Sequence, residues 1–105
     1  MLRVNNKVAT HISVMMDYCI EHGIEIDTII LSEYYFILFN NLFKNSDEVE
    51  VIHKTNSSML FNYKGVDIKL LLGNFTTDEQ HKVDFLRIHT GTDTYLIKDF
   101  YFKLK

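Results

Sequence analysis

The stretch Ser32-Glu-Tyr-Tyr-Phe-Ile-Leu-Phe-Asn-Asn-Leu-Phe-Lys-Asn45 decides the fold, because it is too apolar to stand alone in water. At about 100° per residue it predicts a helix with an apolar arc about 200° wide, roughly twice the stripe of a one-sided surface helix. Ile37 interrupts the remaining polar strip, and the side chain of Ser32 can cap the first free N–H groups. We therefore expect the helix to pack on a sheet, with a second element over its flank. The arc contains Tyr34, Tyr35, Phe36, Leu38, Phe39, Leu42 and Phe43.

Two elements are predicted before this helix. Residues 6–22 place their apolar side chains on one broad face, which is typical of an amphipathic packing helix. Gly23 suits the left-handed position that follows a helix end. Residues 24–31 are short and rich in isoleucine, which indicates a strand or an extended connector into the central helix.

A hairpin turning at Lys64-Gly65 is the clearest local pattern after the central helix. A polar turn at 45–48 leads into a strand at 49–55, which opens an antiparallel meander. In the hairpin, the two-residue turn sets apolar side chains opposite one another on a single face. This face should form the core beneath the helix. The opposed pairs are Tyr63 with Val66, Phe61 with Ile68 and Met59 with Leu70.

The last third of the chain predicts a second hairpin. Residues 74–82 form a connector with one helical turn, and 83–90 pair with 93–104 around Gly91-Thr92. Both faces of this hairpin are apolar, so one should meet the helices and the other should remain exposed as a contact patch. One face holds Val83, Phe85, Leu96, Phe100 and Phe102, and the other holds Leu86, Ile88, Tyr95 and Ile97.

The chain of 105 residues is expected to form a single α+β domain over residues 1–105. Two N-terminal helices would pack on one face of a four- or five-stranded antiparallel sheet, a meander. A net charge of −3 without clustered Lys and Arg predicts no nucleic-acid partner. No apolar run reaches the ~20 residues that span a bilayer, and the first residues lack a signal-peptide core. Together with the single Cys19, these features predict a soluble, cytoplasmic protein without a disulfide.

Two groups of residues and one cysteine are candidate chemical sites. His11 and His22, with Tyr18 between them, lie along one edge of the first helix, but the histidines are too far apart to share an ion. Cys19 falls in the middle of the apolar face, where a buried thiol is inert. Arg87 and the polar residues that follow it up to Asp93 lie around the last turn, where they could bind a phosphate or carboxylate group. We predict no metal and no cofactor.

The eight Phe and six Tyr favour an interaction role over a catalytic one, because aromatic side chains dominate binding energy at protein contacts. The expected partner is another protein, either a foreign one or a second copy in a homo-oligomer such as a homodimer. The binding residues predicted from the exposed helix position and the last hairpin are Ile37, Leu86, Arg87, Ile88, His89, Tyr95 and Ile97.

The amino-acid bias gives the interaction role a biological setting. One Ala and no Pro beside abundant Phe, Tyr, Ile, Asn and Lys indicate an AT-rich coding sequence. In composition alone the chain resembles small accessory proteins of bacteriophages or low-GC bacteria, and we expect a phage protein. Such a viral protein would inhibit or redirect a host protein, for example a defence component, in the host cytoplasm. The alternatives are a virion structural or assembly component, and a nucleotide- or small-ligand-binding protein or enzyme that uses the turn from Arg87 to Asp93.

Overall fold

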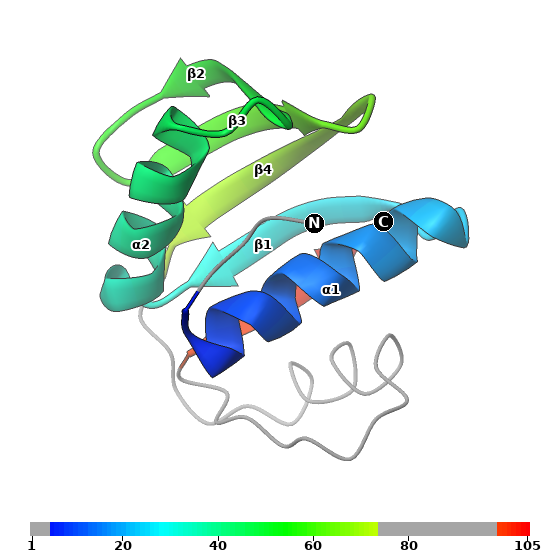
Figure 1. Cartoon of the computed structure of the whole chain (residues 1–105), viewed down its shortest axis with the longest axis horizontal. Coiled ribbons are helices and arrows are strands. Elements are labelled where there is room, and N and C mark those ends of the chain that lie inside the picture. The colour runs from blue at the N-terminus through cyan, green and yellow to red at the C-terminus, as the bar shows by residue number, and fades with distance from the viewer. Residues whose placement is uncertain (1–4, 74–98) are drawn as a thin grey trace.

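Two helices lie on the same face of a five-stranded sheet in the computed structural model, which describes residues 5–73 and 99–105 (Figure 1). The two helices and the five strands are α1 (Lys7–Glu21), β1 (Ile26–Leu31), α2 (Glu33–Lys44), β2 (Val49–Lys54), β3 (Ser58–Tyr63), β4 (Val66–Leu72) and β5 (Phe100–Leu104). The α+β class and the packing of both helices on a mostly antiparallel sheet are therefore confirmed. Neither helix in the described ranges is long and apolar enough to cross a membrane.

Side chains and backbone conformation define the helix ends, and one predicted cap is absent. At the start of α1, the side-chain oxygen of Asn6 accepts hydrogen bonds from the backbone N–H groups of Val8 (3.0 Å) and Ala9 (3.2 Å). After its end, Gly23 takes the left-handed conformation with a φ of +67°. Ser32 does occupy the residue before α2, but its side chain makes no capping hydrogen bond. The prediction that Ser32 caps the helix through its side chain was wrong.

The hairpin between β3 and β4 has the predicted register. Tyr63 pairs with Val66, Phe61 with Ile68 and Met59 with Leu70. Lys64 and Gly65 both have positive φ values, +52° and +84°, as a two-residue turn requires when its twist matches that of the strands. The side chains of these pairs on β3 are buried, so this face carries the core as predicted.

The sheet is not the purely antiparallel meander that was predicted. Its strand order is β2-β3-β4-β1-β5, and β1 runs parallel to β4 and antiparallel to β5. The meander holds for β2 to β4, but β1 enters the middle of the sheet. In this central position Ile29 and Leu31 are buried, and Ile30 between them is partly buried.

The second predicted hairpin lies mostly outside the described residues. Its final strand is seen as β5, in which Phe100 and Phe102 are buried on the helix-facing side as predicted. The ring centroid of Phe100 lies 6.4 Å from that of His11 on α1. This contact places α1 over the β5 side of the sheet.

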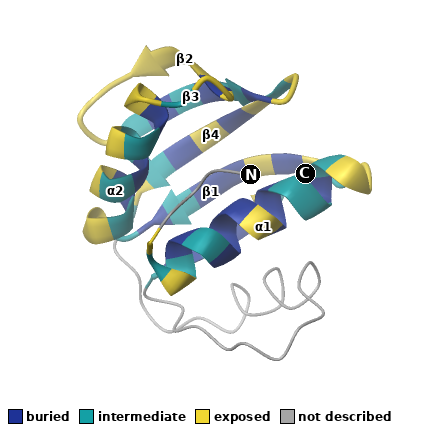
Figure 2. Ribbon diagram, in the orientation of Figure 1, coloured by how far each residue is buried: buried dark blue, intermediate teal, exposed yellow. Residues whose placement is uncertain are grey.

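The central helix is buried over a narrower arc than predicted. Only Phe36, Phe39 and Phe43 of this helix are buried, whereas Tyr34 is 61% exposed. Figure 2 shows buried, intermediate and exposed residues along α2. The ring centroids of Phe43 and of Phe61 on β3 are 4.6 Å apart, which places α2 over the meander. The predicted cover over both flanks of α2 is therefore wrong for the Tyr34 flank. A tyrosine tolerates this position because its hydroxyl group remains in water.

Candidate interaction surface

β2 is the edge strand of the meander among the described strands, with β3 as its single neighbour in the sheet order. The backbone N–H of Thr55, just after β2, donates to the carbonyl oxygen of Ser58 at the start of β3 (2.9 Å). In an antiparallel ladder, hydrogen-bonded and non-hydrogen-bonded pairs alternate. Every second residue of β3 counted from Ser58 therefore bonds to β2, and the residues between them bond to β4.

Three residues of β2 turn their backbone groups away from the sheet. Val49, Val51 and Lys54 are opposite the β3 residues that bond to β4, so their N–H and C=O groups point outward. Ile52 is the extra residue of a β-bulge, because the register shifts between Val51 and His53. The free edge thus offers a short row of donors and acceptors that another extended chain can pair with.

A groove runs beside this edge on the helix-facing side. Its cavity is about 440 Å³ in volume. Phe43 and Val49 are buried and form an apolar floor, while Lys44 and Lys54 are exposed and carry positive charge at the rim. The groove is lined by Asn40, Phe43, Lys44, Ser46, Val49, Val51 and Lys54.

Apolar side chains are exposed on both β2 and α2. Val51 is 39% and Ile52 is 50% exposed on β2, and Ile37 is 50% exposed on α2. Single exposed apolar residues are ordinary, but adjacent ones on an edge strand are a feature that soluble monomers usually avoid. We call Val49, Val51, Ile52 and Lys54, together with the groove beside them, the β2 edge.

A polar network ties α1 to the β3–β4 turn. The hydroxyl of Tyr63, a fully buried residue, donates to Asp17 Oδ1 (2.6 Å), and Lys64 Nζ donates to the same oxygen (2.8 Å). Burial alone raises the pKa of Asp17, but the hydrogen bonds from Lys64 and Tyr63 outweigh it and hold this pKa below its usual value. Burial and the bond to Asp17 raise the pKa of Tyr63. Neither group changes protonation near neutral pH, so the network is structural.

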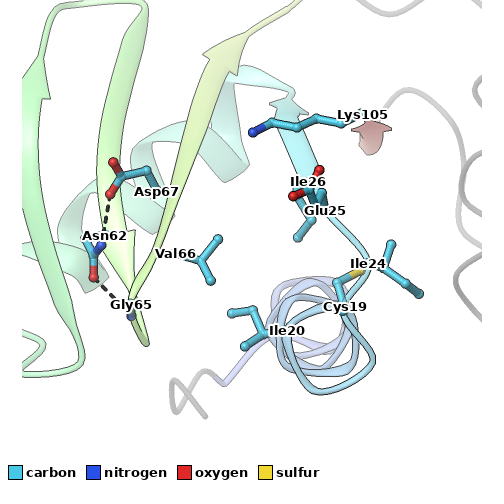
Figure 3. A pocket seen from close by; sticks show the side chains of 11 residues that line it. Cys19, Ile20, Ile24, Glu25, Ile26, Asn62, Gly65, Val66, Asp67 and Lys105 are labelled. Carbon is cyan, nitrogen blue, oxygen red and sulfur yellow. Dashed lines mark hydrogen bonds between the residues drawn. The ribbon is translucent and has the colours of Figure 1, made fainter.

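A second cavity, of about 460 Å³, lies between the end of α1, the start of β1 and the β3–β4 turn (Figure 3). The amide of Asn62 on its wall is already used, since its Nδ2 donates to Asp67 (2.9 Å) and its Oδ1 accepts from the backbone N–H of Gly65 (3.2 Å). Burial raises the pKa of the Cys19 thiol to about 11, so this group stays protonated and unreactive. The lining supplies no activated nucleophile. Its residues are Cys19, Ile20, Gly23, Ile24, Glu25, Ile26, Asn62, Gly65, Val66, Asp67 and Lys105.

Of the predicted cluster on the first helix, Tyr18 and His22 are in contact, but His11 does not join them. His11 is buried, whereas the ring of His22 stacks on that of Tyr18 with centroids 4.0 Å apart. Within residues 5–73 and 99–105, no three His, Cys, Asp or Glu side chains are grouped as a metal ion would require. Cys19 is buried, as its position on the apolar face predicted.

Of the predicted binding residues, the structure describes Ile37 alone, and its side chain is half exposed on α2. The other six, Leu86, Arg87, Ile88, His89, Tyr95 and Ile97, lie outside the described residues, as does the turn at 87–93. The sequence reasoning missed the β2 edge. The signal was present in the consecutive Val51 and Ile52, which break the alternation of a strand covered on one face.

Comparison of the chain with protein-family models, with curated proteins and with solved structures finds no match.

Proposed function

We propose that the protein is a non-catalytic interaction module that binds another protein chain along the β2 edge. The observation that supports it is the outward row of backbone groups at Val49, Val51 and Lys54 beside an apolar groove. An extended segment can add to such an edge, with main-chain hydrogen bonds supplying affinity and the groove supplying specificity. The exposed side chains of Val51 and Ile52 would then be covered.

The bias in composition suggests the setting: a phage accessory protein in the host cytoplasm, with a host protein as one candidate partner. A second copy of the chain is the other. Neither the virion component nor the enzyme or nucleotide-binding alternative is favoured by a contact among the described residues.

The test compares substitutions at two valines of similar exposure. Val51 is 39% exposed on the β2 edge, and Val14 is 45% exposed on α1. Val51→Lys should abolish both self-association and the capture of partner proteins, because it puts an unpaired charge into the contact. Val14→Lys should leave both unchanged. Equal capture and equal self-association by the wild type and by Val51→Lys would refute the proposal.

A further inference from the structure

We infer that the partner of the β2 edge is a second copy of this chain, whose own β2 strand pairs antiparallel with it about a two-fold axis at Val51. This inference rests on the proposed function, since it names the occupant of the same edge. It is carried by two properties of β2, its hydrogen-bond register and its order of charges.

The outward backbone groups of β2 are self-complementary. If Val51 pairs with the partner's Val51, the next outward residue on one side is Val49, two residues earlier. On the other side it is Lys54, three residues later, because the bulge adds one residue. The same three-for-two spacing is already present against β3, where Val51 and Lys54 are opposite Phe61 and Met59. The free edge therefore fits a copy of itself without a further distortion.

The charges of the strand are complementary in the same arrangement. Asp47, Glu48 and Glu50 precede Val51, whereas His53 and Lys54 follow it. An antiparallel copy sets the end of each strand that carries Glu50 beside the end of the other strand that carries Lys54, so opposite charges rather than like charges lie near one another. In this register Glu50 faces the partner's His53 on the sheet face that points away from the helices.

The apolar residues of the edge gain cover from the same contact. Val51 meets the partner's Val51 at the axis, and Ile52 lies beside the partner's Glu50. Two five-stranded sheets would become one continuous sheet. A contact made by one strand from each copy is small, so we expect a dimer with a dissociation constant on the order of micromolar.

The test is a disulfide trap that depends on the register. In the double variant Glu50→Cys/His53→Cys, the two new thiols on one strand are too far apart to join each other, but each faces its counterpart across the dimer axis. Mild oxidation should yield a disulfide-linked dimer. Each single variant should stay unlinked, because each substituted position lies roughly 8 Å from its own copy across the axis, beyond disulfide reach. The buried Cys19 is common to all variants.

A proline variant tests the contact without a crosslink. The N–H of Val51 points outward, so Val51→Pro removes no hydrogen bond to β3 and is tolerated on an edge strand. It should keep the wild-type melting temperature and lose the dimer in sedimentation. Glu50→Pro removes an inward N–H and should lower the melting temperature, which confirms the assigned bond directions.

The outcomes separate the two claims. No linked dimer from the double variant, or equal linking of the single variants, overturns the second copy as occupant. If Val51→Lys then still loses captured proteins that Val14→Lys retains, the proposed function stands with a foreign partner. If Val51→Lys captures the same proteins as the wild type, both the second copy as occupant and the proposed function are refuted.

Discussion

The bond between Tyr63 and Asp17 should stabilise the fold by an amount that a double-mutant cycle can isolate. The Tyr63 residue is fully buried and its hydroxyl donates to Asp17 Oδ1 at 2.6 Å, so after Asp17→Ala this hydroxyl has lost its partner. A hydrogen bond to a charged group contributes about 1.5–3 kcal/mol. We expect Tyr63→Phe and Asp17→Ala each to lower the free energy of unfolding by about 2 kcal/mol.

The double variant should lose less than the sum of the two single losses, with a coupling of about 1.5 kcal/mol. Urea unfolding at neutral pH measures these free energies, and each kcal/mol corresponds to about 4 °C in melting temperature for a chain of this size. Lys64→Met is the control, because its side chain is 40% exposed and a surface ion pair contributes about 0–1 kcal/mol. Additivity of the Tyr63 and Asp17 losses within about 0.3 kcal/mol would contradict the assigned network.

Three further predictions concern single positions. Gly65→Val should lower the free energy of unfolding by about 1–3 kcal/mol. The cause is backbone strain at a φ of +84° and not a clash, because an added Cβ meets no atom within 4 Å. Gly65→Asn should lower the free energy of unfolding much less in the same urea assay, because asparagine tolerates a positive φ. Cys19 should react with a thiol reagent at pH 8 about 100-fold more slowly in the folded than in the unfolded protein, because burial raises its pKa to about 11; equal rates would contradict its burial. The pKa of Asp17 is lowered in the folded state, so its stabilisation is present above the ordinary value of 3.8 and is lost as the pH falls through the folded pKa. Asp17→Asn should flatten this acid loss, measured by urea unfolding at several pH values.

The local elements were predictable because their signals lie within a few residues. Lys64-Gly65 and the alternating residues around it specify one turn and one register, and the structure has that register. The end of α1 at Gly23 follows from a similar short-range rule, the tolerance of glycine for positive φ.

The position of β1 was not predictable from such patterns. Its pairing with β4 joins segments about forty residues apart, as in Thr28 with Lys69, and no short-range spacing encodes which neighbour a central strand takes. The isoleucine-rich run of residues 24–31 indicated only a strand or an extended connector. The wide apolar arc of α2 was misleading for the related reason that Tyr34 counts as apolar in a pattern but can remain in water.

The predicted contact surface stays a prediction, because six of its seven residues lie outside the described part of the chain. Ile37 was identified as an exposed apolar residue and is 50% exposed. The β2 edge was missed because the direction of backbone groups depends on the ladder with β3, and the sequence does not display the bulge at Ile52. Whether a strand lies at an edge is a property of the whole sheet.

Residue-resolved hydrogen exchange at two protein concentrations tests the β2 edge most directly. The amides of Glu50 and His53 point to β3 and should be protected at both concentrations. The amides of Val51 and Lys54 point outward, so they should exchange freely in dilute protein and become protected when the concentration is raised a hundredfold. Exchange at Val51 and Lys54 that stays fast at the high concentration would contradict strand pairing between copies, and protection of both at the low concentration would contradict the free edge itself.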